Sequence, residues 1–239
     1  MESVRQAVVT GATRGIGRAI ARRLAQDGFS LVLNYAHDEG QGRAALAEVR
    51  RWSADSILVQ SDVTSEAGAE HLVLTAAERG KIHLLVNSVG DFLFKPVLAT
   101  TLAEWEEILA SNLTSAFLCS RAVVPHFRQR GGGQIVYVGA MHAEVLRAVP
   151  NTVPYTIAKT GLLVLMKSLA KSEGPSGIRV NAVNPGFMEG GAEEEKAASI
   201  PLSRLGHAEE IAAAVSFLAS EEAGYITGAV INVDGGAFL

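Results

Sequence analysis

The sequence predicts a single α/β domain of the doubly wound type, in which helices cover both faces of a seven-stranded parallel sheet. Seven short runs rich in β-branched residues alternate with stretches of helical periodicity. Most of these runs are continuously apolar, which is typical of parallel strands buried on both faces. No linker, repeat or low-complexity segment divides the 239 residues, so we expect residues 1–239 to form one domain.

The elements follow in regular order along the chain. The predicted strands are residues 6–10, 30–34, 56–60, 84–87, 134–138, 178–183 and 229–233. Helical periodicity between them is clearest over 17–28 and 208–220. The "RGGG" at 130–133 predicts a turn from a helix into the fifth strand.

Composition narrows the class of function. Hydrophobic residues make up 48% and charged residues 19%, as in an ordered globular protein. The net charge of −4 offers no basic surface for nucleic acid or an anionic membrane. The single cysteine, Cys119, lies in an apolar helical pattern and fits a buried thiol in a reducing compartment. No apolar run approaches the ~18 residues of a membrane span, and no signal-peptide pattern is present. We therefore expect a cytoplasmic protein without a nucleic-acid or membrane partner. We also expect a small-molecule substrate and no metal.

A glycine-rich turn follows the first strand and precedes a helix. Its glycines are Gly11, Gly15 and Gly17, in the spacing GxxxGxG. Glycine lets the backbone approach a pyrophosphate, and the helix N-terminus offers N–H groups to the anion. This position, at the first strand–helix junction, predicts a dinucleotide site of the Rossmann type.

The end of the second strand indicates which nucleotide binds. The residues there are Asn34, Tyr35, Ala36 and His37. NAD enzymes usually place a carboxylate at this point to bind the ribose hydroxyls, whereas here no acid opposes a 2′-phosphate, although Asp38 follows closely. Arg14, inside the glycine loop, supplies positive charge to such a phosphate. Both features favour NADP(H) over NAD(H).

Further motifs join the glycine loop in a fixed order. They are Asp62 in "SDVT", "NSVG" at 87–90, Asn112 in "WEEILASNL", Tyr155 and Lys159 in "PYTIAK", and "NPGF" at 184–187. Together they resemble the short-chain dehydrogenase/reductase family over nearly the whole chain. The stretch from residue 203 to the end is similar to the family's bacterial 3-oxoacyl-acyl-carrier-protein reductases.

The resemblance implies a site and a reaction. NADPH would deliver hydride to a carbonyl carbon, and Tyr155 would give a proton to the oxygen. Lys159, one helical turn further on, would lower the pKa of Tyr155 and bind the nicotinamide ribose, and Asn112 would hold a relay water. The implied cofactor-binding residues are Gly11, Thr13, Arg14, Gly15, Ile16, Gly17, Asn34, Tyr35, Ala36, His37, Asp62, Val63, Asn87, Ser88, Val89, Gly90, Tyr155, Lys159, Pro185, Gly186 and Met188. A homotetramer (or homodimer) is implied as well, through helices around 112–127 and 156–172.

The chain departs from the family at its catalytic serine, which normally lies thirteen positions before the tyrosine. Aligning the fifth strand puts Ala140 there, and counting back thirteen gives His142; no serine lies between Gln134 and Tyr155. Losing one oxyanion donor costs roughly 3–4 kcal/mol in the transition state.

Three interpretations follow from this departure. His142 replaces the serine as donor, since imidazole can donate a hydrogen bond. Alternatively, the enzyme is a serine-independent reductase of a pteridine, enoyl or quinone-like substrate; quinonoid dihydropteridine reductases resemble this chain in having alanine at that position. The third interpretation is an NADP(H)-binding protein with little or no turnover.

A second departure is the segment expected to cover the substrate, residues 187–203, which is short and acidic. Gly190 stands where the family usually has a threonine that contacts the nicotinamide amide. Like charges repel, so an acidic lid argues against an acidic carrier-protein substrate. Candidates for an apolar pocket wall are Phe92, Phe94, Val145, Leu146, Phe187 and Met188.

Overall fold

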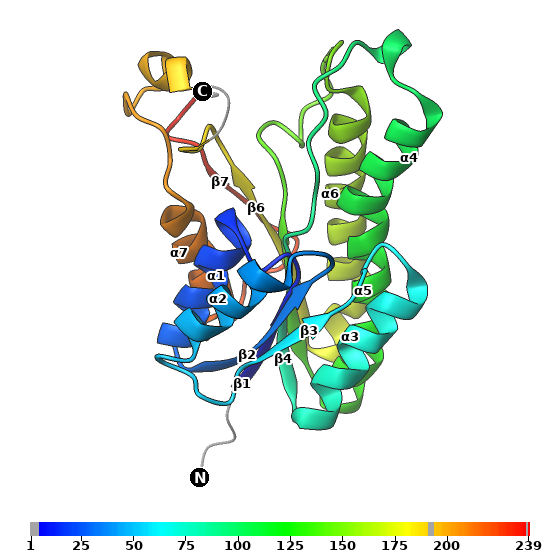
Figure 1. The fold of residues 1–239 in the computed structure, drawn as a ribbon, viewed down its shortest axis with the longest axis vertical. Helices are drawn as coiled ribbons and strands as arrows, with labels where there is room; N and C mark the ends of the chain where they lie inside the picture. The colour runs from blue at the N-terminus through cyan, green and yellow to red at the C-terminus, as the bar shows by residue number, and fades with distance from the viewer. Residues whose placement is uncertain (1–4, 191–193, 238) are drawn as a thin grey trace.

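The computed structural model describes residues 5–190, 194–237 and 239, and it shows the predicted doubly wound fold (Figure 1). Seven parallel strands form one sheet in the order β3-β2-β1-β4-β5-β6-β7. The strands are β1 (Arg5–Val9), β2 (Phe29–Tyr35), β3 (Ile57–Gln60), β4 (Ile82–Asn87), β5 (Gly133–Val138), β6 (Ile178–Pro185) and β7 (Val230–Val233). Each predicted strand is present, with boundaries that differ by at most two residues.

Helices cover both faces of this sheet. They are α1 (Gly15–Gln26), α2 (Glu39–Val49), α3 (Glu66–Arg79), α4 (Leu102–Leu109), α5 (Ser115–Gln129), α6 (Val153–Glu173) and α7 (Ala208–Ala219). Short 3-10 segments are Val97–Ala99, Gly174–Ser176 and Glu194–Ser199. The helices α1, α2 and α7 share one face, and α3, α5 and α6 share the other.

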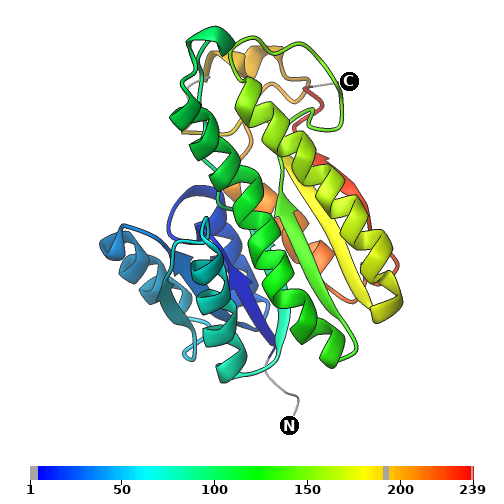
Figure 2. The same cartoon turned by 90° about the vertical axis from the view of Figure 1, so that its right-hand side faces the viewer.

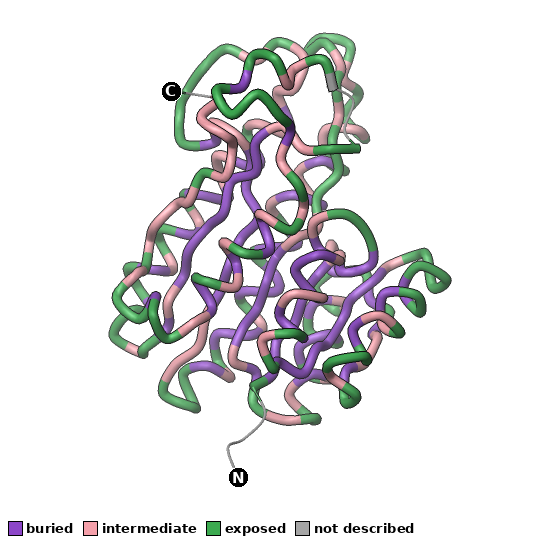
Figure 3. Tube along the Cα trace, turned by 90° about the vertical axis from the view of Figure 1, so that its left-hand side faces the viewer, coloured by how far each residue is buried: buried purple, intermediate pink, exposed green. Residues whose placement is uncertain are grey.

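Side chains that alternate along each strand contribute to two hydrophobic cores, one on each face of the sheet. Successive side chains of a strand point to opposite faces. On β1, Ala7 and Val9 pack with α1 and α7, whereas Val8 packs with α3 and α5. Figure 3 shows the strands buried in the interior and the outer sides of the helices exposed. Burial on both faces explains why the strands are continuously apolar.

The connections place a ligand site at one edge of the sheet. The chain runs from β1 outward to β3, then returns so that β4 pairs with the other side of β1. The loops after β1 and β4 therefore diverge, which opens a crevice at the carboxyl ends of these strands. The glycine loop and "NSVG" are these two loops.

One long helical stretch lies beside α6, formed by α4, a π turn at Ala110–Thr114 and α5 (Figure 2). Over its 28 residues, Leu102–Gln129, it is apolar enough by composition to cross a membrane, contrary to the sequence-based expectation that no stretch is. More than half of its most apolar window is buried inside the fold, against the sheet and α3. Core helices of α/β domains have this same composition, so it is weak evidence for a membrane span.

Candidate active site

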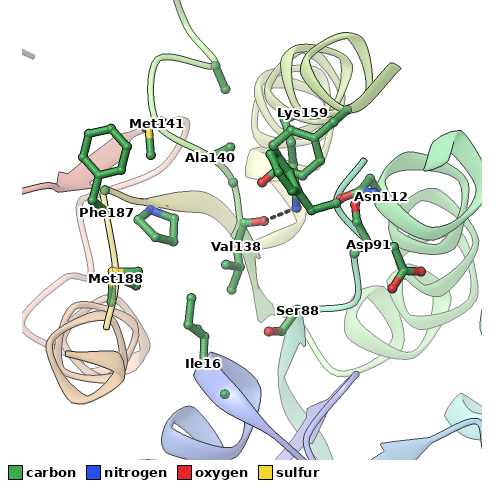
Figure 4. Close-up of a pocket in the computed structure, with 18 of the residues that line it drawn as sticks. Ile16, Ser88, Asp91, Asn112, Val138, Ala140, Met141, Lys159, Phe187 and Met188 are labelled. Atoms are coloured by element: carbon green, nitrogen blue, oxygen red, sulfur yellow. Dashed lines mark hydrogen bonds between the residues drawn. The ribbon is translucent and has the colours of Figure 1, made fainter. Parts of the chain in front are cut away.

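A cavity of about 790 Å³ lies at the crevice between β1 and β4. Figure 4 shows its walls: Ile16 of α1 on one side, Asn112 and Lys159 on another, and Met141, Phe187 and Met188 opposite. Val138 and Ala140, at the end of β5, lie between them. The cavity thus joins the predicted cofactor loop to the predicted catalytic pair.

The glycine loop has the shape that a pyrophosphate requires. Gly11 and Gly15 have positive φ of 60° and 50°, and a Cβ on Gly17 would lie 2.2 Å from the carbonyl oxygen of Gly11. Helix α1 starts at Gly15, and no side chain caps its first N–H groups. These uncapped donors beside the cavity fit an anionic ligand, as the sequence predicts.

The loops after β2 and β3 extend this site away from the cavity. Asn34 is buried, and its side chain donates to the carbonyl oxygen of Ser61 at 2.9 Å, which ties the two loops together. Hydrogen bonds from the side chain and N–H of Thr64 lower the pKa of Asp62. His37 is exposed and close enough for its charge to lower this pKa further. Asp38 caps α2 by accepting from Gln41 N–H at 2.9 Å.

The predicted cofactor residues thus divide into two groups. Those that line the cavity are Gly11, Arg14, Gly15, Ile16, Gly17, Ser88, Val89, Gly90, Tyr155, Lys159, Pro185, Gly186 and Met188. Those that do not line it are Thr13, Asn34, Tyr35, Ala36, His37, Asp62, Val63 and Asn87. Thr13, Val63 and Asn87 are buried and support the loops from within.

Tyr155 and Lys159 lie on one face of α6. The Nζ atom of Lys159 is 5.8 Å from the centroid of the Tyr155 ring and donates to the carbonyl oxygen of Val138 at 2.9 Å. The ring of Phe92 packs edge-on against Tyr155, with centroids 5.1 Å apart. Both polar groups are therefore held in position by packing and by β5.

Burial shifts the pKa values of this pair in opposite directions. It raises the pKa of Tyr155 to about 12 and lowers the pKa of Lys159 to about 8. This corrects the expectation that the ammonium lowers the pKa of Tyr155. Lys159 donates to Val138, and the loss of solvation dominates at the phenol. Tyr155 consequently holds its proton at neutral pH, as a proton donor must.

Asn112 enters the site through the π turn. Its Nδ2 atom donates to the carbonyl oxygens of Asp91 and Ile108 at 2.8 and 3.1 Å. Its Oδ1 atom is buried without a hydrogen-bond partner among the described residues. A Cβ on Gly90 would lie 2.3 Å from this oxygen and 3.3 Å from Lys159 Nζ, so the two polar atoms face one small space. An acceptor and a donor so placed fit a hydroxyl or a water, and π turns often mark functional sites.

The structure separates Ala140 from His142. Ala140 lines the cavity with a methyl group, and His142 is not among the lining residues. After Ala140 the chain folds into two turns, in which Ala143 N–H donates to Ala140 and Val145 N–H donates to the carbonyl oxygen of His142. These turns bury Ala143 and give His142 a φ of 57°. The structure therefore does not support the prediction that His142 reaches the cavity.

The apolar wall agrees in part with the sequence-based list. Phe92, Phe94, Phe187 and Met188 line the cavity. Val145 and Leu146 do not, and Leu146 is 89% exposed. The lining residues that sequence reasoning missed are Asp91, Val138, Gly139, Met141, Ala143, Arg147, Thr152, Thr156, Glu189 and Lys196. Most belong to loops without periodicity, although Thr152 and Thr156 flank Tyr155 and a helical projection would have found them.

The expected lid is attached to the rest of the fold at its start. Met188 pairs with Gly206, whose N–H donates to the carbonyl oxygen of Phe187 and whose carbonyl oxygen accepts from Glu189 N–H, and the Glu189 carboxylate lies 2.9 Å from the His207 ring. Gly190 and Lys196 also line the cavity. Residues 191–193 of the lid lie outside the described residues.

Comparisons with known proteins show the family of this chain. A family model described as Enoyl-(Acyl carrier protein) reductase matches residues 11–237. The 3-oxoacyl-[acyl-carrier-protein] reductase FabG of Staphylococcus aureus is 32% identical over 248 residues, spanning all of both chains. A 3-oxoacyl-[acyl-carrier-protein] reductase of Synechocystis sp. is 35% identical and covers 98% of this chain and 96% of its own. A crystal structure described as a "putative short-chain alcohol dehydrogenase" from Sinorhizobium meliloti 1021 has a TM-score of 0.92 at 33% identity, covering 98% of this chain and 96% of that chain.

The fold and the site define a Rossmann-type oxidoreductase that uses a nicotinamide cofactor. Within that class, the chain belongs to the short-chain dehydrogenase/reductase family.

Proposed function

We propose that the protein reduces a carbonyl group with NADPH, with Tyr155 as the proton donor. The observation that carries this proposal is one cavity lined by the glycine loop, Asn112, Tyr155 and Lys159. A glycine turn suited to a phosphate and the partly buried phenol of Tyr155 meet there at the carboxyl ends of the strands.

The charges around the adenosine end support NADP(H). Arg14 is exposed at the rim of the cavity, and the end of β2 carries no carboxylate. The nearest acid in sequence, Asp38, accepts a hydrogen bond at the start of α2. A 2′-phosphate would therefore meet one guanidinium from Arg14 and the ring of His37.

The residues divide the reaction between them. A nicotinamide held by the glycine loop would supply a hydride for the carbonyl carbon, with the carbonyl bonding pair moving onto the oxygen. Tyr155 transfers its phenolic proton to that oxygen. Lys159, held at Val138, places a positive charge beside the resulting phenolate, and Asn112 Oδ1 offers an acceptor for a relay water.

The leading substrate is a 3-oxoacyl thioester. The similar proteins of Staphylococcus aureus and Synechocystis are named for this reduction, and the aromatic wall suits an acyl chain. One observation favours a second candidate: Ala140 offers no hydroxyl after β5, as in a serine-independent reductase of a pteridine, enoyl or quinone-like substrate. The description of the matching family model favours the enoyl member of this group.

The test is NADPH oxidation at ~340 nm with acetoacetyl-coenzyme A, with the Tyr155→Phe variant in parallel. We expect turnover in the wild type and a loss of ~100-fold or more in the variant, the scale of general acid catalysis. NADPH binding should persist in both. Turnover that survives in Tyr155→Phe would remove Tyr155 as the acid. Cofactor binding without turnover of any ketone, enoyl, pteridine or quinone would favour a non-catalytic role.

A further inference from the structure

Two hydroxyl groups lie on the wall of the cavity that carries Tyr155. They belong to Thr152 and Thr156, and both line the cavity. Ser88 is the remaining aliphatic hydroxyl among the lining residues, and it belongs to the cofactor side: a Cβ on Gly17 would lie 3.2 Å from its Oγ. Within the described part of the chain, the substrate side therefore draws its aliphatic hydroxyls from the start of α6.

Thr152 stands at a position where its hydroxyl would normally serve the helix. It is the N-cap of α6, and an N-cap threonine usually accepts a hydrogen bond from an N–H of the first turn. Here the side chain makes no such bond, with φ −134° and ψ 27°, and Pro154 in the first turn has no N–H to offer. The Thr152 hydroxyl is thus left out of the helix cap.

The Thr152 hydroxyl contacts the Thr156 hydroxyl, and this contact leaves the Thr152 proton available for another hydrogen bond. Thr152 Oγ1 lies 3.3 Å from Thr156 Oγ1, one helical turn further on, and either atom can donate. When Thr156 donates to Thr152, the Thr152 proton is directed to another acceptor. Thr152 lines the cavity, where a ligand atom can accept this proton.

Thr152 precedes Tyr155 by about one helical turn at the start of α6. Side chains on a helix tilt toward its N-terminus, so the phenol of Tyr155 leans over the turn that begins at Thr152. A carbonyl oxygen that receives the Tyr155 proton therefore lies on the Thr152 side of the cavity. At the position of the missing serine, Ala140 lines the cavity with a methyl group and offers that oxygen no donor side chain.

We propose that Thr152 donates a hydrogen bond to the carbonyl oxygen of the substrate, in place of the serine that the chain lacks at Ala140. This inference rests on the proposed carbonyl reduction. Negative charge grows on the oxygen as the hydride reaches the carbon, and the hydrogen bond strengthens with it. Thr152 keeps its proton throughout, and the proton that is transferred comes from Tyr155.

The experiment compares Thr152→Val, which removes the hydroxyl at nearly constant volume, with Thr152→Ser, which retains it. With acetoacetyl-coenzyme A and NADPH, we expect Thr152→Val to lower kcat by ~100-fold, the scale of one oxyanion donor. Thr152→Ser should keep kcat within a few-fold, and NADPH affinity should not change in either. Thr160→Val, two helical turns from Thr152 and outside the cavity lining, is the matched control and should match the wild type.

A second variant tests the replacement directly. Introducing Ala140→Ser into Thr152→Val places a hydroxyl in the cavity just after β5, and we expect kcat to recover at least tenfold. A Thr152→Val rate within twofold of the wild type would overturn this inference alone. Equal losses in Thr152→Val and Thr152→Ser, without recovery by Ala140→Ser, would also overturn it by indicating a packing role. A wild type that binds NADPH but reduces no ketone would overturn the proposed function, and this inference with it.

Discussion

We propose that Arg14 determines the preference for NADPH over NADH. It is exposed in the glycine loop, and no carboxylate stands at the end of β2. We expect Arg14→Ala to raise the Kd for NADPH about tenfold, because a charged hydrogen bond is worth ~1.5–3 kcal/mol, and to leave the Kd for NADH unchanged. Calorimetric titration of both cofactors measures this, with Arg51→Ala as an exposed control elsewhere. Equal weakening of both cofactors would contradict a 2′-phosphate contact.

The protonation of Lys159 makes the free energy of unfolding depend on pH. Its pKa is about 8 in the folded chain, below the 10.5 of an ordinary lysine, because burial disfavours the charge. Between these pH values the unfolded chain holds a proton that the folded chain has released. The free energy of unfolding should therefore rise with pH across this window, by up to ~3 kcal/mol.

Denaturant unfolding from pH 7.5 to 10.5 measures this contribution as the difference between the wild type and Lys159→Met. The difference is needed because Cys119 also contributes to the pH dependence of both proteins. Burial raises the pKa of Cys119 to about 12, so above pH 9 the unfolded chain loses this proton more readily and the free energy of unfolding falls. Lys167→Met, an exposed lysine of the same helix, should keep the wild-type profile. A wild-type profile in Lys159→Met would show that Lys159 is not the titrating group.

The loop from β5 to α6 is the element that shapes the substrate half of the cavity. It carries Ala140 and Met141 at one end and Thr152 at the other. Glu144, between them, accepts hydrogen bonds from Asn184 of β6 at 2.9 Å and Asn232 of β7 at 2.7 Å. One carboxylate thus fixes the loop to two strands.

Replacing that carboxylate should loosen the loop but leave α6 in place. We expect Glu144→Gln to raise KM for the ketone several-fold while kcat falls less than threefold, because an amide cannot accept from both asparagines as a carboxylate does. Steady-state kinetics on Glu144→Gln measures both values, with Glu222→Gln as an exposed control. A fall in kcat with KM unchanged would instead place Glu144 in the chemistry.

At the scale of the whole molecule, hydrophobic periodicity and glycine spacing predict the sheet and the position of the cofactor loop. Continuously apolar strands and the loop of Gly11, Gly15 and Gly17 indicate the sheet and its switch point. The pattern does not encode the turns after Ala140, and His142, within these turns, is not among the residues that line the cavity. It also does not show that burial outweighs charge at Tyr155, because that depends on tertiary packing.

Assembly is the property of the whole molecule that bears on the site. We propose a homotetramer in which α5 and α6 form an interface. These helices expose large apolar side chains, among them Phe117 (43%), Ile157 (47%) and Val164 (62%), and they run side by side on one face (Figure 2). Exposed apolar side chains that gather on one face often mark a protein–protein interface.

Light scattering after size exclusion should give about 100 kDa for four chains of 25.1 kDa. Val164→Asp should produce smaller species, because a buried unpaired charge at an interface is costly. Leu74→Asp, on the exposed side of α3, should leave the mass unchanged. Dissociation should also lower kcat, since α6 carries Tyr155 and Lys159 on the face opposite its exposed side. A wild type of 25 kDa with full turnover would show that the α6 face needs no partner to hold the site.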